Sequence, residues 1–254
     1  MAQDEKALAK RAETGFALID DPDARGIMET AFDQLGITRF ELNRLKIPAG
    51  GSTTWEIEDV TEKSGIRSAQ EIDVVILGVQ GNQKAWWSTP VGEGGEESPS
   101  CTSTDGSVGD GNNTLDPEAA PGQHRCADCP WSQWGSSRNG GGGKDCSDTS
   151  LLFFITPNEA IPMYLSVPAT SLKKVQKYGL ALISARIPMP SVVTRLSLQK
   201  ATSGGGHTYS TLALSKVDDL DPDAAEEMRQ LGTDFMVKMT TKESLAGFAA
   251  DSGN

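Results

Sequence analysis

Four cysteines are the residues of this 254-residue chain with the clearest capacity for chemistry. They follow the spacing C-x24-C-x2-C-x16-C, in which Cys126 and Cys129 form the C-x2-C pair. A C-x2-C turn lets two thiolates reach one tetrahedral zinc ion, and two further thiolates complete such a site. The spacing therefore predicts a structural zinc ion bound by Cys101, Cys126, Cys129 and Cys146. His124, two residues before the pair, is an alternative fourth ligand.

Other uses of this cysteine-rich window fit the residues less well. Buried thiols that bind nothing are the main alternative, and a redox C-x-x-C would need an adjacent βαβ unit, which the sequence does not predict. The stretch "GGGGKD" (140–145) is not a phosphate-binding loop, because Arg138 and Asp145 stand where such a loop needs Gly and Ser or Thr. A zinc ion held by four thiolates would be closed to catalysis.

Tryptophans and basic side chains form a second group with functional potential. Single-stranded nucleic acid is bound by cationic grooves in which aromatic side chains stack on bases. On a strand, Trp86 and Trp87 point to opposite faces, so one of them is expected to be exposed beside Lys84. Burial in a core is the alternative for every tryptophan. The candidate nucleic-acid contacts are Lys84, Trp86, Trp87, Trp134, Arg138, Lys144, Arg195, Lys200 and Tyr209.

The charge of the chain is unevenly distributed. The net charge is −12, yet residues 144–216 carry eight basic and three acidic side chains. This block indicates either a cationic face or a chance distribution of charges over a solvated surface. Residues 218–227 contain six carboxylates. This acidic stretch either occupies a cationic groove or recruits partner proteins, or it is a solvated helix start that complements the helix dipole. A secretory signal and an apolar run of the roughly 18 residues that span a membrane are not found, so a cytosolic protein without membrane contact is expected.

The hydrophobic patterns predict a mainly β protein with flanking helices. An N-terminal helical segment is expected within 1–37, with Asp21 as its cap, followed by a β domain over 38–216. An acidic helix, with Asp221 as its cap, and a tail are expected over 217–254. The strand pattern fits a small antiparallel barrel or a strongly bent sheet with inserted loops. A barrel of the oligonucleotide/oligosaccharide-binding (OB) type, with a Gly-rich zinc-binding insert at about 90–150, is one economical architecture. The expected elements are strands at 53–60, 71–80, 83–89, 151–157 and 162–168, a helix at 171–184, and a long hairpin of 191–201 with 207–217. The strands at 71–80 and 83–89 would form a hairpin around Gly81-Asn82.

Several motifs, taken in order, resemble a family of bacteriophage-encoded proteins. They are "CTSTDGSVG", "CADCPWSQWGS", "GGGGKDC", "PMYLSVPATSLKKVQKY" and "VVTRLSLQKA…HTYSTLAL", between about Cys101 and Lys216. The family comprises phage single-stranded-DNA-binding proteins with a modified OB barrel and a cysteine-rich insert. The resemblance implies that the four cysteines bind zinc. The chain ends in "DSGN" and lacks the terminal aromatic residue found in the acidic tails of several replication proteins.

These observations favour a non-enzymatic single-stranded-DNA-binding protein of phage replication or recombination, in the cytoplasm of an infected bacterium. Replication proteins are expected partners of the acidic tail, and a homo-oligomer is an open alternative to a monomer. The competing hypothesis is a phage structural or adaptor protein that uses the zinc insert for protein–protein contacts. An enzyme is less favoured, because the chain has two histidines and neither an H-E-x-x-H nor a G-x-S-x-G motif.

Overall fold

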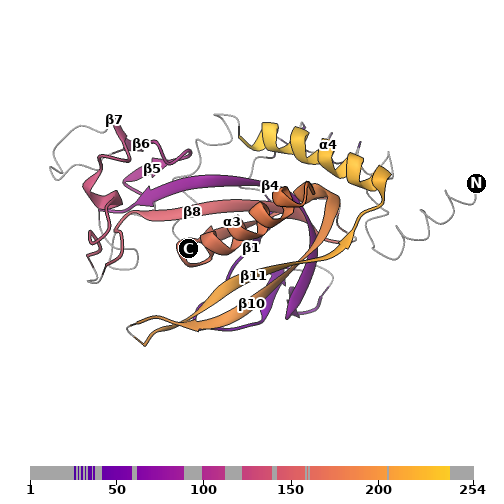
Figure 1. Ribbon diagram of the computed structural model, residues 1–254, viewed down its shortest axis with the longest axis horizontal. Helices are drawn as coiled ribbons and strands as arrows, with labels where there is room; N and C mark the ends of the chain where they lie inside the picture. The colour runs from indigo at the N-terminus through magenta and orange to yellow at the C-terminus, as the bar shows by residue number, and fades with distance from the viewer. Residues whose placement is uncertain are drawn as a thin grey trace, which may run out of the picture. The chain divides into compact units, whose positions relative to one another are not determined.

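A computed structural model describes most of the chain from residue 42 to residue 240. The described residues are 42–58, 62–88, 99–111, 122–138, 142–157, 159, 161–204 and 206–240, with seven single positions between 26 and 37. They belong to two units, one formed by the described residues up to Val79 with Leu151–Met239, the other by those of Gln80–Ser150 with Thr240. The elements (Figure 1) are β1 (Arg44–Leu45), β2 (Trp55–Glu58), β3 (Ile66–Ala69), β4 (Glu71–Trp86), β5 (Cys101–Ser103), β6 (Val108–Gly111), β7 (Gly122–Arg125), the 3-10 helix η2 (Pro130–Ser132), β8 (Ser147–Ile155), β9 (Met163–Pro168), α3 (Ala169–Ser184), η3 (Met189–Ser191), β10 (Val192–Thr202), β11 (Thr208–Asp219) and α4 (Pro222–Met239).

The first unit is built on an open, mixed sheet with the strand order β1-β9-β8-β4-β10-β11. β1 is parallel to β9, whereas β10 is antiparallel to both β4 and β11. Among the described strands, β1 and β11 end this path without pairing to each other. The prediction of a mainly β protein with helices is therefore confirmed, but the prediction of a closed antiparallel barrel is wrong.

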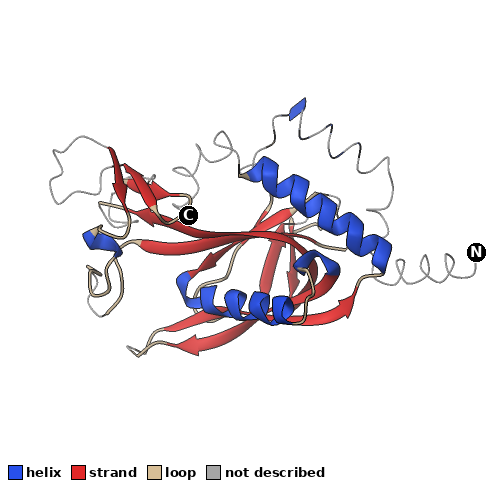
Figure 2. Cartoon of the chain, turned by 45° about the horizontal axis from the view of Figure 1, so that its top comes forward, coloured by secondary structure: helices blue, strands red, loops and turns tan. Residues whose placement is uncertain are grey.

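The covering of both faces of this sheet explains why it stays open. Side chains alternate between the faces of a strand, and Val75, Phe153 and the α4 residue Phe235 share one core cluster. The neighbouring Phe154 packs with Val175 of α3 in a second cluster. Figure 2 shows α4 above the long strands β4 and β8, and α3 between these strands and the β10–β11 hairpin. Strands covered on both faces need nearly continuous apolar runs, which "VVIL" and "LLFFI" supply.

The two helices follow their sequence signals closely. In α4, the Asp221 carboxylate accepts a hydrogen bond from the main-chain N–H of Ala224 at 3.1 Å, as expected of a helix cap. α3 buries Val175 and Leu182 and also protects the edge strand β11. There the Ser171 hydroxyl oxygen accepts a hydrogen bond from the main-chain N–H of Leu212 at 3.0 Å. This N–H lies on the edge of the sheet and would otherwise have no strand to bond to.

The structure differs from the sequence prediction at the expected 71–89 hairpin, and it describes the N-terminal helical segment only in part. The predicted hairpin of 71–80 and 83–89 is wrong, because both segments belong to the continuous strand β4. Asn82 has a φ of 59° within that strand, so the turn-prone pair produces a local irregularity. At the N-terminus, Met28 and Phe32 are helical and buried, while the expected cap Asp21 lies outside the described residues. Within the described part of the chain, the helices are too short or too polar to cross a membrane.

Candidate functional site

The second unit carries the cysteines on a small antiparallel sheet in the order β4-β5-β6-β7. In its register, Cys101 lies opposite Trp86, and His124 lies opposite Gly109. The turn between β5 and β6 is held by Asp105, whose carboxylate accepts the N–H groups of two following residues at 2.7 and 3.1 Å. These hydrogen bonds lower the pKa of Asp105. The sheet thus brings one cysteine and one histidine to the same place.

The remaining three cysteines are positioned by turns. The Cys129 N–H donates to the Cys126 carbonyl at 3.4 Å, which closes the C-x2-C turn before η2 begins. The Cys126 N–H donates at 2.9 Å to a carbonyl in the turn between β5 and β6. This hydrogen bond attaches the C-x2-C turn to the small sheet. The Cys146 N–H donates to the Trp131 carbonyl, also at 2.9 Å. Main-chain hydrogen bonds therefore gather residues that are up to 45 positions apart in the sequence.

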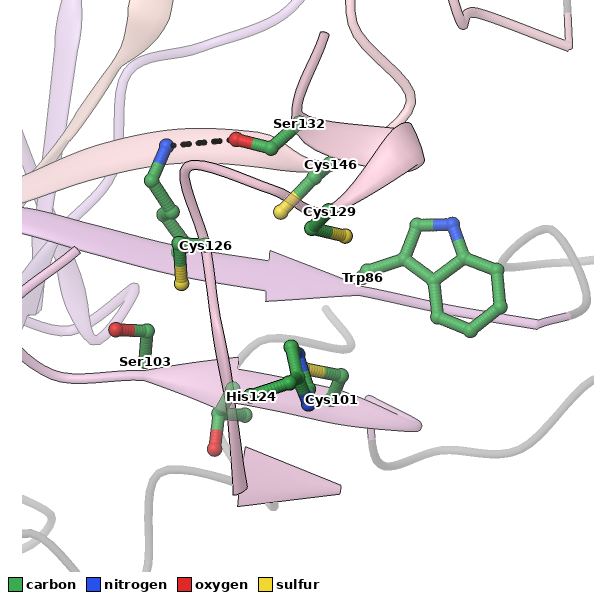
Figure 3. A pocket seen from close by; sticks show the side chains of 10 residues that line it. Trp86, Cys101, Ser103, His124, Cys126, Cys129, Ser132 and Cys146 are labelled. Atoms are coloured by element: carbon green, nitrogen blue, oxygen red, sulfur yellow. Dashed lines mark hydrogen bonds between the residues drawn. The ribbon is translucent and has the colours of Figure 1, made fainter. Parts of the chain in front are cut away.

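All four cysteines and His124 line one small cavity (Figure 3). None of the four cysteines forms a disulfide, and each is at most 8% exposed. The cavity volume of about 10 Å³ is close to the space that one water molecule needs, so the site suits a single atom and is too small for an organic ligand. The other lining residues are Lys84, Trp86, Thr102, Ser103 and Ser132.

The donor set of this cavity matches zinc in type, although its side chains are not arranged as a finished metal site. Within the described residues, no group of three or more His, Cys, Asp or Glu side chains is assembled tightly enough to hold an ion. Binding would therefore draw the sulfur atoms inward. Thiolates and imidazoles are the preferred ligands of zinc, so the residues present fit this ion in chemistry and number.

The electrostatics of the cavity favour neutral thiols unless a cation is present. Burial, followed by the neighbouring thiolates, raises the pKa of Cys101 to about 12. Burial likewise raises the pKa of Cys146 to about 12, although the Lys84 ammonium acts in the opposite direction. Several thiolates cannot share so small a buried space without a compensating positive charge.

An aromatic cluster forms the core beside the cysteines. The Trp86 and Trp131 rings are stacked, with centroids 5.2 Å apart and an interplanar angle of 13°. The Trp86 indole N–H donates to the Asp145 carboxylate at 2.6 Å, and the Arg138 guanidinium lies 5.7 Å from the Trp86 ring centroid. Trp86 is only 6% exposed, so its place is structural and its ring is not presented to a ligand.

The basic side chains predicted to contact nucleic acid in this unit are engaged by carboxylates. Lys84 and Lys144 both bind Asp148, and Arg138 forms an ion pair with Asp145 at 2.8 Å. Burial alone would raise the pKa of Asp148, but the hydrogen bonds from the two lysines lower it. These three cations are therefore paired with two carboxylates of the same unit, and Lys84 and Lys144 share one of them.

Trp134 is the predicted contact whose ring is open to solvent. Its side chain is 79% exposed, and the Lys144 ammonium lies 5.3 Å from its ring centroid. Trp87 is half-buried, and its carbonyl oxygen accepts a hydrogen bond from Arg138. The prediction that Trp86 or Trp87 would be exposed beside Lys84 is wrong, because Trp86 is buried and Trp87 is half-buried. The exposed indole ring among the described tryptophans of this unit is that of Trp134.

The other three predicted contacts lie in the first unit, on the hairpin of β10 and β11. Arg195 binds both carboxylate oxygens of Asp73, at 2.7 and 2.9 Å, and also contacts Glu71 at 3.0 Å. Lys200 is exposed and Tyr209 is half-buried. The nine predicted contacts are therefore divided between two units and are not described as one surface.

Sequence reasoning missed Gly109 and the two aspartates that flank Cys146. A Cβ atom at position 109 would lie 2.5 Å from His124 Nε2 and 3.0 Å from Cys101 Sγ, so only glycine lets these side chains meet. The pattern "KDCSD" placed Asp145 and Asp148 beside a predicted ligand, which was a usable signal for charge pairing. Nothing in the sequence marked Gly109 among 27 glycines.

Comparison of the whole chain with known protein families, curated proteins and solved structures finds no match.

Proposed function

We propose that this chain is a non-enzymatic single-stranded-DNA-binding protein of a bacteriophage, acting in the cytoplasm of the infected cell, with a second unit stabilised by zinc. The observation that carries the proposal is the exposed Trp134 ring beside Lys144. Both residues lie on the segment between Cys129 and Cys146, which line the same cavity. The motif resemblance to phage single-stranded-DNA-binding proteins supports the same function.

Zinc would be held by Cys126, Cys129 and Cys146, with the fourth ligand supplied by Cys101 or His124. When bound, the ion would balance the negative charge of the thiolates and cross-link segments that are distant in the sequence. In small modules such a cross-link contributes most of the folding free energy. Because Cys129 and Cys146 enclose the segment that carries Trp134, fixing both of its ends restricts the motion of that ring.

Stacking on Trp134 is the proposed source of DNA affinity. A base stacked on an exposed indole contributes about 1–3 kcal/mol, and any base can stack, so little sequence preference is expected. Lys144 stands next to the ring and can approach a phosphate, but it shares its charge with Asp148. We therefore expect weaker salt dependence than for a groove lined with unpaired cations.

The test is fluorescence anisotropy with a labelled oligothymidylate and a matched duplex. The wild-type protein should bind the single strand more tightly than the duplex. Trp134→Ala should weaken single-strand binding by about 5- to 150-fold, which corresponds to about 1–3 kcal/mol. Trp134→Phe, which keeps a stacking ring, serves as the matched control. Absence of single-strand binding at micromolar protein concentration would refute the proposed function.

A second candidate function, that of a structural or adaptor protein, is favoured by exposed apolar side chains on α3. Leu180 and Ile183 are 62% and 68% exposed and lie one turn apart, with Lys177 one turn before them. Size-exclusion chromatography with light scattering distinguishes this role, because a scaffold protein should form large assemblies without DNA. Recruitment of replication proteins by the acidic C-terminal segment also stays a proposal, and residues 241–254 lie outside the described part.

A further inference from the structure

The hydrogen bonds of His124 determine which of its ring nitrogens can bind a metal. Nδ1 lies 3.2 Å from the Gly122 carbonyl oxygen. A carbonyl oxygen can only accept, so Nδ1 carries the proton of the neutral imidazole. Nε2 then has a free lone pair, and it lies 3.3 Å from Cys101 Sγ, at the edge of the shared cavity (Figure 3). A histidine that donates from one ring nitrogen to a carbonyl while the other is free has the arrangement of metal-binding histidines.

The distance between His124 and Cys101 also fits ligands of one ion. Zinc–nitrogen bonds of about 2.0 Å and zinc–sulfur bonds of about 2.3 Å place two tetrahedral ligands about 3.5 Å apart. A thiolate facing a bare imidazole nitrogen at 3.3 Å is unfavourable unless a proton or a metal ion lies between or beside them. The glycine at position 109 leaves the room that this close pair requires.

The cavity therefore has five donors for the four positions of a structural zinc ion. Three thiolates and one neutral imidazole around a divalent ion leave a net charge of −1, whereas four thiolates leave −2. The smaller charge is less costly in a space where every cysteine is at least 92% buried. Charge and tautomer thus point to the same ligand set.

We propose that His124 Nε2 is the fourth zinc ligand beside Cys126, Cys129 and Cys146, and that Cys101 is a reserve thiol that replaces it when the imidazole is removed. This inference rests on the proposed zinc site. It departs from the four-cysteine set that the spacing predicts. The site should therefore tolerate the loss of either Cys101 or His124 but not of both.

Cobalt(II) in place of zinc tests this ligand set, because its sulfur-to-metal charge-transfer absorption per bound ion rises with the number of thiolates. Cys101→Ala should leave the absorption unchanged. His124→Ala should raise it by about one third, as a fourth thiolate binds. The double variant should lose cobalt. His207→Ala, in the exposed turn of the β10–β11 hairpin, is the matched control and should resemble the wild type.

The contrary result is equally well defined. If Cys101→Ala lowers the absorption by about one quarter while His124→Ala does not change it, the ion has four cysteine ligands and the inference is wrong. If His124→Ala fails to fold by circular dichroism, the Cys101→Ala spectrum decides alone. Absence of any charge-transfer band in the wild type would refute the metal site itself, and the oligonucleotide titration would then test DNA binding independently.

Discussion

Replacing Gly109 by alanine should disrupt the cavity without altering any functional group. The new Cβ atom would lie 2.5 Å from His124 Nε2 and 3.0 Å from Cys101 Sγ. Both distances are shorter than the van der Waals contact of a Cβ atom with nitrogen or sulfur. The imidazole cannot simply turn away, because its Nδ1 is bound to the Gly122 carbonyl. Either the His124 ring breaks this hydrogen bond, or strand β6 moves away from the ring.

The magnitude follows from overpacking a small, buried space. Inserting one methyl group into a well-packed interior costs about 1–3 kcal/mol, and loss of a hydrogen bond adds about 1 kcal/mol. We therefore expect the free energy of opening of the second unit to fall by about 2–4 kcal/mol. Zinc affinity should fall as well, since His124 and Cys101 can no longer lie side by side.

Hydrogen exchange followed by mass spectrometry measures this effect in peptides from residues 99–111 and 122–138. Gly122→Ala is the matched control, because it lies on the adjoining strand β7 and its Cβ would meet nothing within 4 Å. The control should exchange like the wild type, whereas Gly109→Ala should exchange faster in both peptides. Equal protection in the two variants would show that the side chains do not meet as the structure places them.

Three further predictions concern pH, charge pairing and the core of the first unit. Thiols of the unfolded chain lose their protons near pH 9.0, whereas the pKa values of Cys101 and Cys146 are about 12 in the folded chain. Without metal, the free energy of unfolding should therefore fall above pH 9 by up to about 1.4 kcal/mol per thiol per pH unit. Urea denaturation at about pH 8 and pH 10 should show this loss without zinc and not with it. Arg138→Ala should destabilise the second unit by about 2–3 kcal/mol in the same assay, because it leaves the Asp145 carboxylate, whose side chain is 9% exposed, without its cation. An effect below about 0.5 kcal/mol would contradict that role. Gly232→Ala should lower the melting temperature, since its Cβ would lie 2.6 Å from a main-chain oxygen of β4, whereas Gly204→Ala, in open space, should not.

Local signals in the sequence determined several parts of this protein. The helix α3, the hairpin of β10 and β11, and the Asp221 cap of α4 all follow from short-range periodicity and capping, and the structure has them where they were expected. Helix and hairpin geometry depends on residues a few positions apart, so the sequence alone specifies it. The spacing of the cysteines also indicated one shared site, and the structure places all four on one cavity.

Tertiary structure alone decided the features that depend on contacts between distant residues. Gly81-Asn82 has the local preference of a turn, but β4 continues through it, because its two ends pair with β10 and with β5. Trp86 is buried by packing against Trp131, whereas Trp134 is exposed. Lys84 and Arg138 form ion pairs with carboxylates, and these pairs form only when separate segments fold together. Burial and charge pairing are long-range properties, and a linear pattern does not specify them.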